Sequence, residues 1–503
     1  MTQPAACLAV LGTGSDVGKS VVATALCRLF ADRGLRVAPF KAQNMSNNSG
    51  VTAEGLEMGR AQIVQAEAAR VAPHCDMNPV LLKPVSDQGS QVVLNGRAWL
   101  EASGRAYYQR KDELFAESCA ALERLRRTCD LVVMEGAGSC AEVNLMAGDI
   151  VNLRMAAHAN APVILVADID RGGVFAQIVG TLACVPQEQQ ARIRGFVINR
   201  FRGDLDLFTS GVAWIEAQTG RPVFGVLPWF RHFRIEAEDA VVIEQTRAFT
   251  PAASGEAAIA VIRLPHISNF TDFDPLTGLD GVQLVYLHQP QYLHGFRAVI
   301  LPGTKSTRSD LDWLAASGWR TRLLDYAAAG GHLLGICGGF QMLGERVEDP
   351  HGVEGGAGVT DGLGLLPVTT VLRAPKTTTL TAFTWDGIAG QGYEIHMGCT
   401  DAPAGSGLVA VHRRNGADCA DTDGCVAMGG RVLGTYLHGL FDEPAITRRW
   451  LAGIGLGEVV VDRLHGPAAR DRAYDQLAEH TATHLNLEAI IALLPPQLRE
   501  VRR

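Results

Sequence analysis

Several features that mark particular protein classes are missing from this 503-residue sequence. None of its 11 cysteines forms a CxxC pair, which argues against a zinc ribbon, an iron–sulfur site or a disulfide framework. The formal net charge is -8, and Lys and Arg form no stripe with interleaved aromatic residues. We therefore expect no nucleic-acid partner.

Long apolar stretches and a charged leader are missing as well. The sequence has no run of about 18 apolar residues, and its first residues lead into a glycine-rich loop without a charged n-region. We therefore expect a cytoplasmic protein with no membrane partner. The sequence leaves open whether copies of the chain form a homo-oligomer.

The length exceeds what one ordinary core accommodates and indicates two domains. In the first half, short runs rich in Val, Ile and Leu alternate with amphipathic segments such as 19–34. The strand-like runs are 7–12, 35–40, 130–136, 161–168 and 195–200. This alternation predicts an α/β fold with a doubly wound parallel sheet, whose ligands bind at the carboxyl ends of the strands.

A second series of strand-like runs follows, at 258–265, 298–303, 332–337 and 432–439. Between the two series, the small, Pro- and Gly-bearing segment 248–257 is typical of a linker. We therefore predict two doubly wound α/β domains, at 1–247 and 258–455. A C-terminal helical extension at 456–503 is predicted to follow, and the sequence indicates no role for it.

The sequence GTGSDVGKS, which begins at Gly12, follows a strand and opens a helix, as a phosphate-binding loop does. Backbone N–H groups around Gly12, Thr13 and Gly18 would converge on phosphate oxygens. Lys19 would reach the outer phosphates of ATP, and the Ser20 hydroxyl would bind Mg²⁺. Thr13 stands where the first glycine of GxxxxGK[ST] is expected, so a glycine-rich turn with an incidental lysine remains the alternative on the motif alone.

This variant loop resembles that of the dethiobiotin synthetase superfamily, whose members attach phosphate to a carboxyl group. The resemblance extends to Lys41 and Glu135, each at the end of a predicted strand. Lys41 would neutralise charge on the transferring phosphoryl group, and Glu135 would hold Mg²⁺. A solvated strand-end charge is the alternative for each. The resemblance also implies that Asn199 contacts the adenine ring.

Charged residues also follow the predicted strand 161–168, in the sequence VADIDRGG. Asp168, Asp170 and Arg171 are candidates for contacts with a metal or the substrate, because the glycine pair after them permits close ligand approach. A capping aspartate and a surface arginine would give the same sequence.

The sequence HLLGICGGFQML contains a cysteine between a strand and a helix that we expect to begin near Phe340. This pattern is the thiol counterpart of a nucleophile elbow, which makes Cys337 a candidate nucleophile. His438, at a later strand end, is the candidate base. The backbone N–H groups of Gly338 and Gly303 would bind the oxyanion.

These features resemble a class I glutamine amidotransferase domain, which would use glutamine as the ammonia donor. The resemblance has one departure, because that family commonly carries a glutamate two residues after the histidine and Leu440 stands there. Either another group orients His438 or the site works as a dyad. His396, in GYEIHMG, is a further pocket candidate, with a structural histidine as the alternative.

Nearly the whole chain resembles the cobyric acid synthase family. The resemblance rests on the sequences FKAQNMSNNSG, EMGRAQIVQAEAAR, MNPVLLKPVSDQGSQVV, MEGAGSCAEVNL, ADIDRGGVFAQIVGTL and INRFRGD. It implies ATP- and glutamine-dependent amidation of the b, d, e and g carboxylates of a corrinoid, adenosylcobyrinic acid a,c-diamide, in cobalamin synthesis.

Three other functions are alternatives to this one. Cobyrinic acid a,c-diamide synthase shares the layout and the chemistry, but segment 41–93 argues against it. A partitioning-type ATPase switch that binds protein partners would carry a second lysine where Gly14 stands. A binding protein with an inactive amidotransferase module is the third alternative, favoured by Leu440 in place of the usual glutamate.

Overall fold

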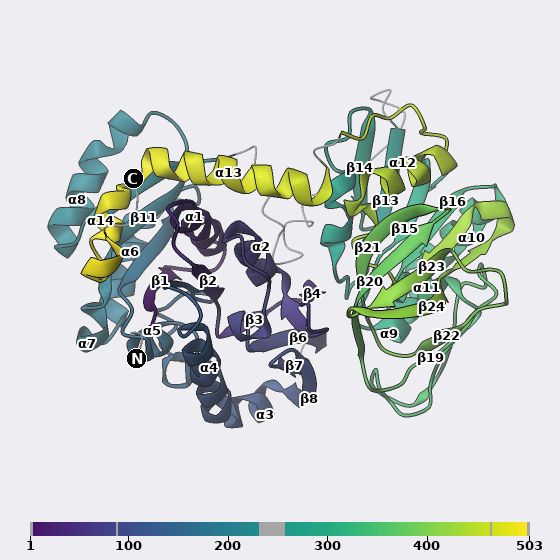
Figure 1. The fold of residues 1–503 in the computed structure, drawn as a ribbon, viewed down its shortest axis with the longest axis horizontal. Coiled ribbons are helices and arrows are strands. Elements are labelled where there is room, and N and C mark those ends of the chain that lie inside the picture. Colours follow the sequence, from purple (N-terminus) through teal and green to yellow (C-terminus); the bar gives the residue numbers. More distant parts are fainter. Residues whose placement is uncertain (1–3, 87–88, 231–256, 463–464, 500–503) are drawn as a thin grey trace.

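The computed structural model describes residues 4–86, 89–230, 257–462 and 465–499, which form two α/β domains and one helix that spans both (Figure 1). The predicted linker lies outside the described residues except for Ala257, which begins a strand. The domain boundary therefore stays a prediction. Among the described residues, every helix is too short or too polar to cross a bilayer.

A six-stranded parallel sheet forms the centre of the N-terminal domain, in the order β12-β11-β10-β1-β9-β2. All five runs predicted in this half belong to it. The strands are β1 Ala6–Gly12, β2 Val37–Phe40, β9 Leu131–Glu135, β10 Val163–Asp168, β11 Ile193–Phe201 and β12 Val223–Pro228. Their continuous apolar sequences fit a sheet that is covered on both faces.

Helices cover both faces of this sheet, as a doubly wound fold requires. Along β1, Leu8 and Val10 belong to one buried apolar cluster, whereas Ala9 and Leu11 belong to another, because successive side chains point to opposite faces. The helices are α1 Lys19–Asp32, α2 Arg60–Ala68, α3 Gly104–Gln109, α4 Lys111–Leu125, α5 Leu153–His158, α6 Val174–Cys184, α7 Gln187–Gln190 and α8 Thr209–Thr219.

Short strands that the sequence did not predict form an insertion after β2. They make a four-stranded sheet in the order β3-β6-β7-β8 and a separate β4–β5 pair. Their bounds are β3 Gln43–Met45, β4 Ser49–Val51, β5 Glu57–Gly59, β6 Val80–Ser86, β7 Gly89–Leu94 and β8 Arg97–Ser103. Contacts of β4 with β20 and β21 connect this insertion to the second domain.

The C-terminal domain has its own six-stranded sheet, in the order β14-β13-β15-β16-β26-β25, and only the edge strand β25 is antiparallel. All four predicted runs belong to it. The strands are β13 Ala257–Ile262, β14 Val282–Leu287, β15 Ala298–Leu301, β16 His332–Ile336, β25 Cys425–Ala427 and β26 Val432–Thr435. The two parallel sheets confirm the predicted α/β class.

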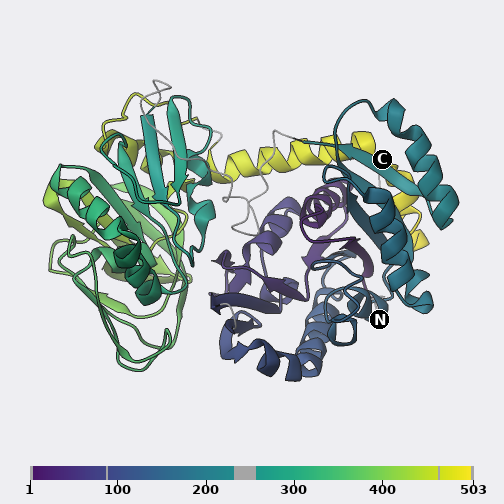
Figure 2. The same cartoon turned by 180° about the vertical axis from the view of Figure 1, so that it is seen from behind.

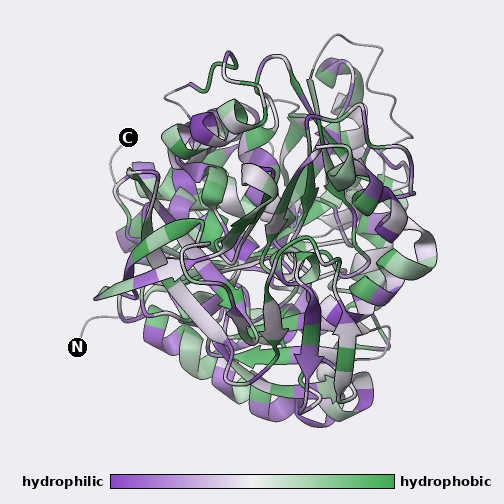
Figure 3. Cartoon of the chain, turned by 90° about the vertical axis from the view of Figure 1, so that its right-hand side faces the viewer, coloured by the Kyte–Doolittle hydropathy of each residue, from purple (hydrophilic) through white to green (hydrophobic). Residues whose placement is uncertain are grey.

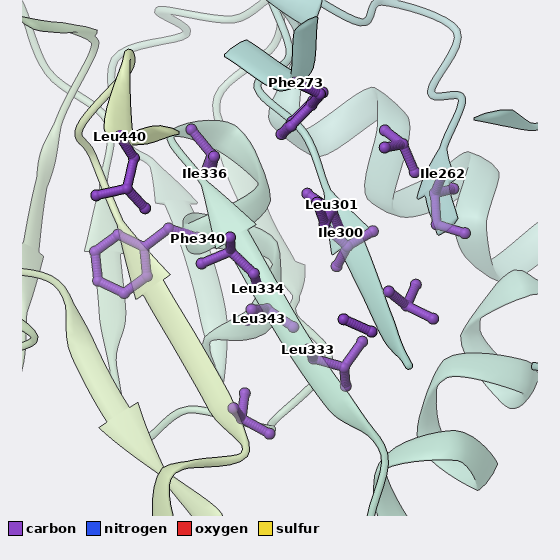
Figure 4. Close-up of a cluster of buried hydrophobic side chains, with 14 of the residues drawn as sticks. Ile262, Phe273, Ile300, Leu301, Leu333, Leu334, Ile336, Phe340, Leu343 and Leu440 are labelled. Atoms are coloured by element: carbon purple, nitrogen blue, oxygen red, sulfur yellow. The ribbon is translucent and has the colours of Figure 1, made fainter. Parts of the chain in front are cut away.

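A large apolar core packs on this sheet, and Figure 4 shows its part around β15 and β16. Leu440, at the position where a glutamate was expected, belongs to this core with Phe340 and Ile336. The helices are α9 Thr307–Ser317, α10 Trp319–Ala328, α11 Gly338–Leu343 and α12 Pro444–Gly453. Helix α11 thus begins two residues before the predicted start, directly after Cys337.

Two further sheets, which the sequence did not predict, lie between β16 and β25. One has the order β18-β17-β19-β22 and the other β21-β20-β23-β24. Their strands are β17 Arg346–Asp349, β18 Gly358–Asp361, β19 Thr369–Val371, β20 Thr377–Trp385, β21 Ile388–His396, β22 Cys399–Asp401, β23 Val409–Arg414 and β24 Ala417–Asp423. In Figure 3, hydrophobic colour follows the central strands, and the peripheral helices are mixed.

The C-terminal segment returns to the first domain. Helix α13 (Gly466–His484) runs from the second domain to the first in both views (Figures 1 and 2), and α14 (Leu487–Ile491) follows it. Near its start, Arg470 pairs with Asp442 of the second domain at 2.9 Å. Further along, Tyr474 donates a hydrogen bond to Glu67 of the first domain at 2.8 Å. Helix α13 therefore contacts both domains.

Candidate functional site

The predicted phosphate loop connects β1 to α1 at the carboxyl edge of the first sheet. Gly18 has φ +95°, and a Cβ there would lie 1.9 Å from the Asn199 Nδ2, so only glycine fits. Asn199 in turn donates a hydrogen bond to the Val17 carbonyl at 2.9 Å. The loop therefore keeps its shape partly through a residue from the end of β11.

Main-chain carbonyls hold the lysine of this loop. Lys19 Nζ donates hydrogen bonds to the carbonyls of Gly14 and Gly138, each at 2.9 Å. Thr13, at the unusual position, donates to Gln177 at 3.3 Å. The ammonium group thus lies against the loop, within the cradle that a phosphate would occupy.

Two predicted residues, Ser20 and Lys41, meet on a third, the buried carboxylate of Glu135. Ser20 Oγ donates to Glu135 Oε1 at 2.8 Å, and Lys41 Nζ lies 3.1 Å from the same oxygen. Gln65, from α2, donates to the other oxygen. Burial alone would raise the pKa of Glu135, but the Lys41 charge and the three hydrogen bonds lower it. Glu135 therefore stays ionised in the interior.

Gln65 was not identified from the sequence. The sequence shows only a glutamine on a helix without clear apolar periodicity, and glutamines are more often exposed than buried. The oxygen donors of Ser20 and Glu135 are of the kind that Mg²⁺ prefers, so this cluster fits the predicted metal. Lys41 and the Mg²⁺ would then both contact the Glu135 carboxylate.

The three candidates at the end of β10 and directly after it each form an ion pair. The pairs are Asp168 with Arg200 at 2.9 Å, Asp170 with Arg202 at 2.6 Å and Arg171 with Asp16 at 2.6 Å. Asp16 belongs to the loop itself and also pairs with Arg200, at 2.8 Å. These residues therefore form one charged network at the loop, whose part in substrate binding stays a prediction.

The candidate nucleophile lies between β16 and α11 in a strained conformation. Cys337 has φ +53° and ψ -111°, which a residue with a Cβ rarely adopts. A Cβ at Gly339 would lie 2.0 Å from the Leu301 carbonyl oxygen, so the turn is too tight for any larger residue there. This geometry is that of a nucleophile elbow.

Asp272 orients the candidate base. The Nδ1 atom of His438 lies 2.7 Å from Asp272 Oδ2, and the Gly439 N–H donates to the other Asp272 oxygen at 3.0 Å. Burial alone would lower the pKa of His438, but the charge and hydrogen bond of Asp272, together with the adjoining Cys337, raise it to about 10. Cys337, His438 and Asp272 are therefore arranged as a candidate triad.

With Leu440 in place of the usual glutamate, the sequence left open whether another group orients His438, and Asp272 is such a group. The orienting carboxylate comes from the segment after β13, 166 residues before His438, rather than from two residues after it. No local motif marks Asp272 in the sequence, because only the fold brings it to the histidine. Leu440 has become part of the apolar core instead.

The predicted oxyanion groups lie beside this triad. A Cβ at Gly303 would lie 3.1 Å from His438 Cε1, and one at Gly338 would lie 3.1 Å from the backbone nitrogen of Thr304. The two glycine segments therefore approach each other closely next to the nucleophile. Gly338 is the first residue of α11, so its N–H group has no partner within the helix.

A pocket beside Cys337 is lined by residues from both domains. Lys83 comes from the first domain, and Asn269, Lys305, Glu354 and Lys376 come from the second. His396, the further sequence candidate, lines the same pocket, and its ring stacks on Tyr436 with 3.7 Å between centroids. The pocket has the polar lining that a small polar substrate requires.

Buried polar contacts join the domains next to this pocket. Glu57 pairs with Lys83 at 2.7 Å within the first domain and with Lys376 of the second at 2.6 Å. Asn269 Oδ1 accepts a hydrogen bond from the Ser49 N–H at 2.9 Å. The first domain therefore forms part of the wall around the candidate glutamine site.

Comparison with protein families matches both domains. Residues 8–242 match the family "CobQ/CobB/MinD/ParA nucleotide binding domain", and residues 258–446 match the family "CobB/CobQ-like glutamine amidotransferase domain". The cobyric acid synthase of Chlorobium phaeobacteroides (strain BS1) is 53% identical, with 97% of this chain and 99% of the relative covered. The chain belongs to the cobyric acid synthase family.

Two further members of the cobyric acid synthase family are also similar over nearly their whole length. The Chlorobaculum tepidum protein is 51% identical over 97% of both chains, and the Chloroflexus aurantiacus protein is 47% identical over 95% of this chain and 97% of its own. As a member of the cobyric acid synthase family, the chain is a glutamine-dependent amidoligase of cobalamin biosynthesis, with an ATP-binding domain and an amidotransferase domain.

Proposed function

We propose that this chain forms cobyric acid by amidating the b, d, e and g carboxylates of adenosylcobyrinic acid a,c-diamide, with glutamine as the ammonia donor and ATP as the activating reagent. The observation that carries the proposal is the pair of sites on one chain: a phosphate loop joined to Lys41 and Glu135, and a Cys337–His438–Asp272 triad. The family of the chain gives the substrate class.

At the first site, the corrinoid carboxylate attacks the γ-phosphorus of ATP, so ADP leaves and an acyl phosphate forms. Lys19 and Lys41 neutralise charge on the transferring phosphoryl group, and Asn199 contacts the adenine ring. Asp168, Asp170 and Arg171 position the corrinoid. Ser20 and Glu135 hold Mg²⁺, which, when bound, adds charge neutralisation at the phosphates.

At the second site, His438 holds the proton of the Cys337 thiol, and the resulting thiolate attacks the side-chain amide carbon of glutamine. The N–H groups of Gly338 and Gly303 stabilise the resulting oxyanion. His438, which Asp272 keeps protonated, gives a proton to the leaving nitrogen, so ammonia departs and a thioester remains. Water then attacks the thioester, His438 takes up its proton, and glutamate is released.

Ammonia finally attacks the acyl carbon of the acyl phosphate and displaces phosphate, which gives the amide. Ammonia is mostly protonated in neutral water, so an enclosed passage between the sites would conserve the reactive form. The buried contacts of Glu57 with Lys83 and Lys376 support such a passage, because they exclude water where the domains meet beside Cys337.

To test the proposal, the purified chain is incubated with ATP, Mg²⁺ and adenosylcobyrinic acid a,c-diamide, and the mass of the corrinoid product is measured. We expect four amidations with glutamine or ammonium. The Cys337→Ala variant should lose activity with glutamine and keep it with ammonium, whereas Lys19→Ala should lose amidation and keep glutamate release. An unchanged corrinoid in every reaction would overturn the proposal, and cobyrinic acid as the preferred substrate would favour a,c-diamide synthase activity.

A further inference from the structure

Two charged residues line the pocket beside Cys337 without a role in the steps above. Lys305 follows the Gly303–Thr304 segment, and Glu354 lies in the loop between β17 and β18. Each influences the pKa of the other, yet no ion pair within 4 Å joins them. Both therefore face the pocket, and neither has an ion-pair partner among the described residues.

Among the described residues, hydrogen bonds hold Glu354 through one carboxylate oxygen. Its Oε2 accepts hydrogen bonds from the backbone N–H groups of Thr307, at 2.7 Å, and Arg308, at 3.5 Å, in the first turn of α9. Asp349 fixes the loop in turn by accepting from the N–H of Glu354 at 2.8 Å. Burial raises the pKa of Glu354 to about 7. A cation at its other oxygen would restore the ionised form.

Lys305 differs from the other two lysines of the pocket. Lys83 and Lys376 both lie within 2.7 Å of Glu57, which compensates their charge. Lys305 has no carboxylate within ion-pair distance among the described residues, and burial lowers its pKa. Nearby Glu101 and Glu57 act on it only at longer range. An anion at Lys305 would therefore be stabilised more than one at either neighbour.

We propose that Lys305 binds the α-carboxylate of glutamine and that Glu354 binds its α-ammonium. Free glutamine carries these opposite charges on one carbon, and its side-chain amide is the group that Cys337 attacks in the proposed function, on which this inference rests. The two charged groups thus select the free amino acid and set the amide carbon against the sulfur. Lys305 and Glu354 are specificity-determining residues.

Three amides separate the two contacts: glutamine, 4-aminobutanamide, which lacks the α-carboxylate, and glutaramate, which lacks the α-ammonium. The reaction measured is acid released from each amide by the full chain. We expect the unaltered chain to show a kcat/KM about 10- to 100-fold lower for each analogue than for glutamine, as the loss of one charge-assisted hydrogen bond predicts.

In Lys305→Met, kcat/KM for glutamine should fall by that factor, mainly through KM, while the value for 4-aminobutanamide stays unchanged. In Glu354→Gln, kcat/KM for glutamine should fall and kcat/KM for glutaramate should stay unchanged. The loop should keep its structure, because the amide oxygen can still accept the hydrogen bond from the Thr307 N–H. Lys305→Arg should restore most of the preference for the carboxylate.

Equal losses for all three amides in Lys305→Met, or an unchanged kcat/KM for glutamine, would overturn the assignment. Amidation with ammonium measures the activity of the ATP site independently of the glutamine site. If it were absent in the unaltered chain while the three amides behaved as expected, the proposed ligase function would fail and the glutamine site would stand.

Discussion

At the scale of single residues, the pKa of His438 decides how the triad responds to pH. The value of about 10 means that the imidazole stays protonated through neutral pH, so glutamate release should decline only as the pH rises toward 10. Asp272→Asn removes the charge that sustains this pKa, so the alkaline decline should move to lower pH. Glutamate release measured from pH 6 to 10 checks the direction.

The same substitution should also lower the rate. Asparagine can still accept a hydrogen bond from Gly439, but it cannot stabilise the imidazolium, and we expect glutamate release to fall about 10²- to 10⁴-fold. Ammonium-dependent amidation should be retained. A variant with normal glutamate release would show that the Asp272–His438 contact is only structural.

The sequence predicts the residues that adjoin strand ends and misses those that the fold brings in from elsewhere. Lys19, Ser20 and Cys337 lie in short motifs between a strand and a helix, so their local pattern indicates a site. Asp272 and Gln65 carry no such pattern. Asp272 is 166 residues from His438 in the sequence, and the packing of η6 (Phe270–Leu276) against η8 (Leu440–Asp442) brings the two together.

At the scale of elements, the apolar parallel strands were predictable, whereas the later sheets were not. A buried parallel strand is a short apolar run, as in β10, and this pattern stands out. Strand β24, with the sequence ADCADTD, is largely exposed and acidic, so neither propensity nor apolar content indicates a strand. Its place depends on pairing with β23, which is a tertiary contact.

The contact between β12 and the C-terminal segment depends on Gly225. A Cβ there would lie 2.1 Å from the His484 carbonyl oxygen, a backbone atom that cannot turn aside. Gly225→Ala should therefore displace the segment that carries α14 and destabilise the first domain by about 1–3 kcal/mol. Differential scanning calorimetry should show a lower Tm.

Gly180 provides a matched control, because it lies in α6 and a Cβ there would meet no atom within 4 Å. Gly180→Ala should leave the Tm unchanged or raise it slightly, since alanine favours a helix by about 0.5–1 kcal/mol. Equal Tm values for the two variants would contradict a structural role for the contact at Gly225.

At the scale of the whole molecule, the domains meet through buried charge as well as through α13. Burial alone would raise the pKa of Glu57, but Lys376 and Lys83 hold it well below its ordinary value. Burial lowers the pKa of Lys376, against the Glu57 charge that raises it, and Lys376 pairs with this one carboxylate, whereas Glu57 pairs with two lysines. The carboxylate is therefore the group on which the charge balance of the interface depends.

This asymmetry predicts different results from removing either partner. Glu57→Gln leaves two buried lysines without a carboxylate and should cost about 3–5 kcal/mol, which would loosen the domain contact. Lys376→Met leaves Glu57 paired with Lys83 and should cost about 1 kcal/mol. Glutamate released per amide formed should rise several-fold in Glu57→Gln and stay near the unaltered ratio in Lys376→Met. The opposite order would mean that the lysine, and not the carboxylate, keeps the domains together.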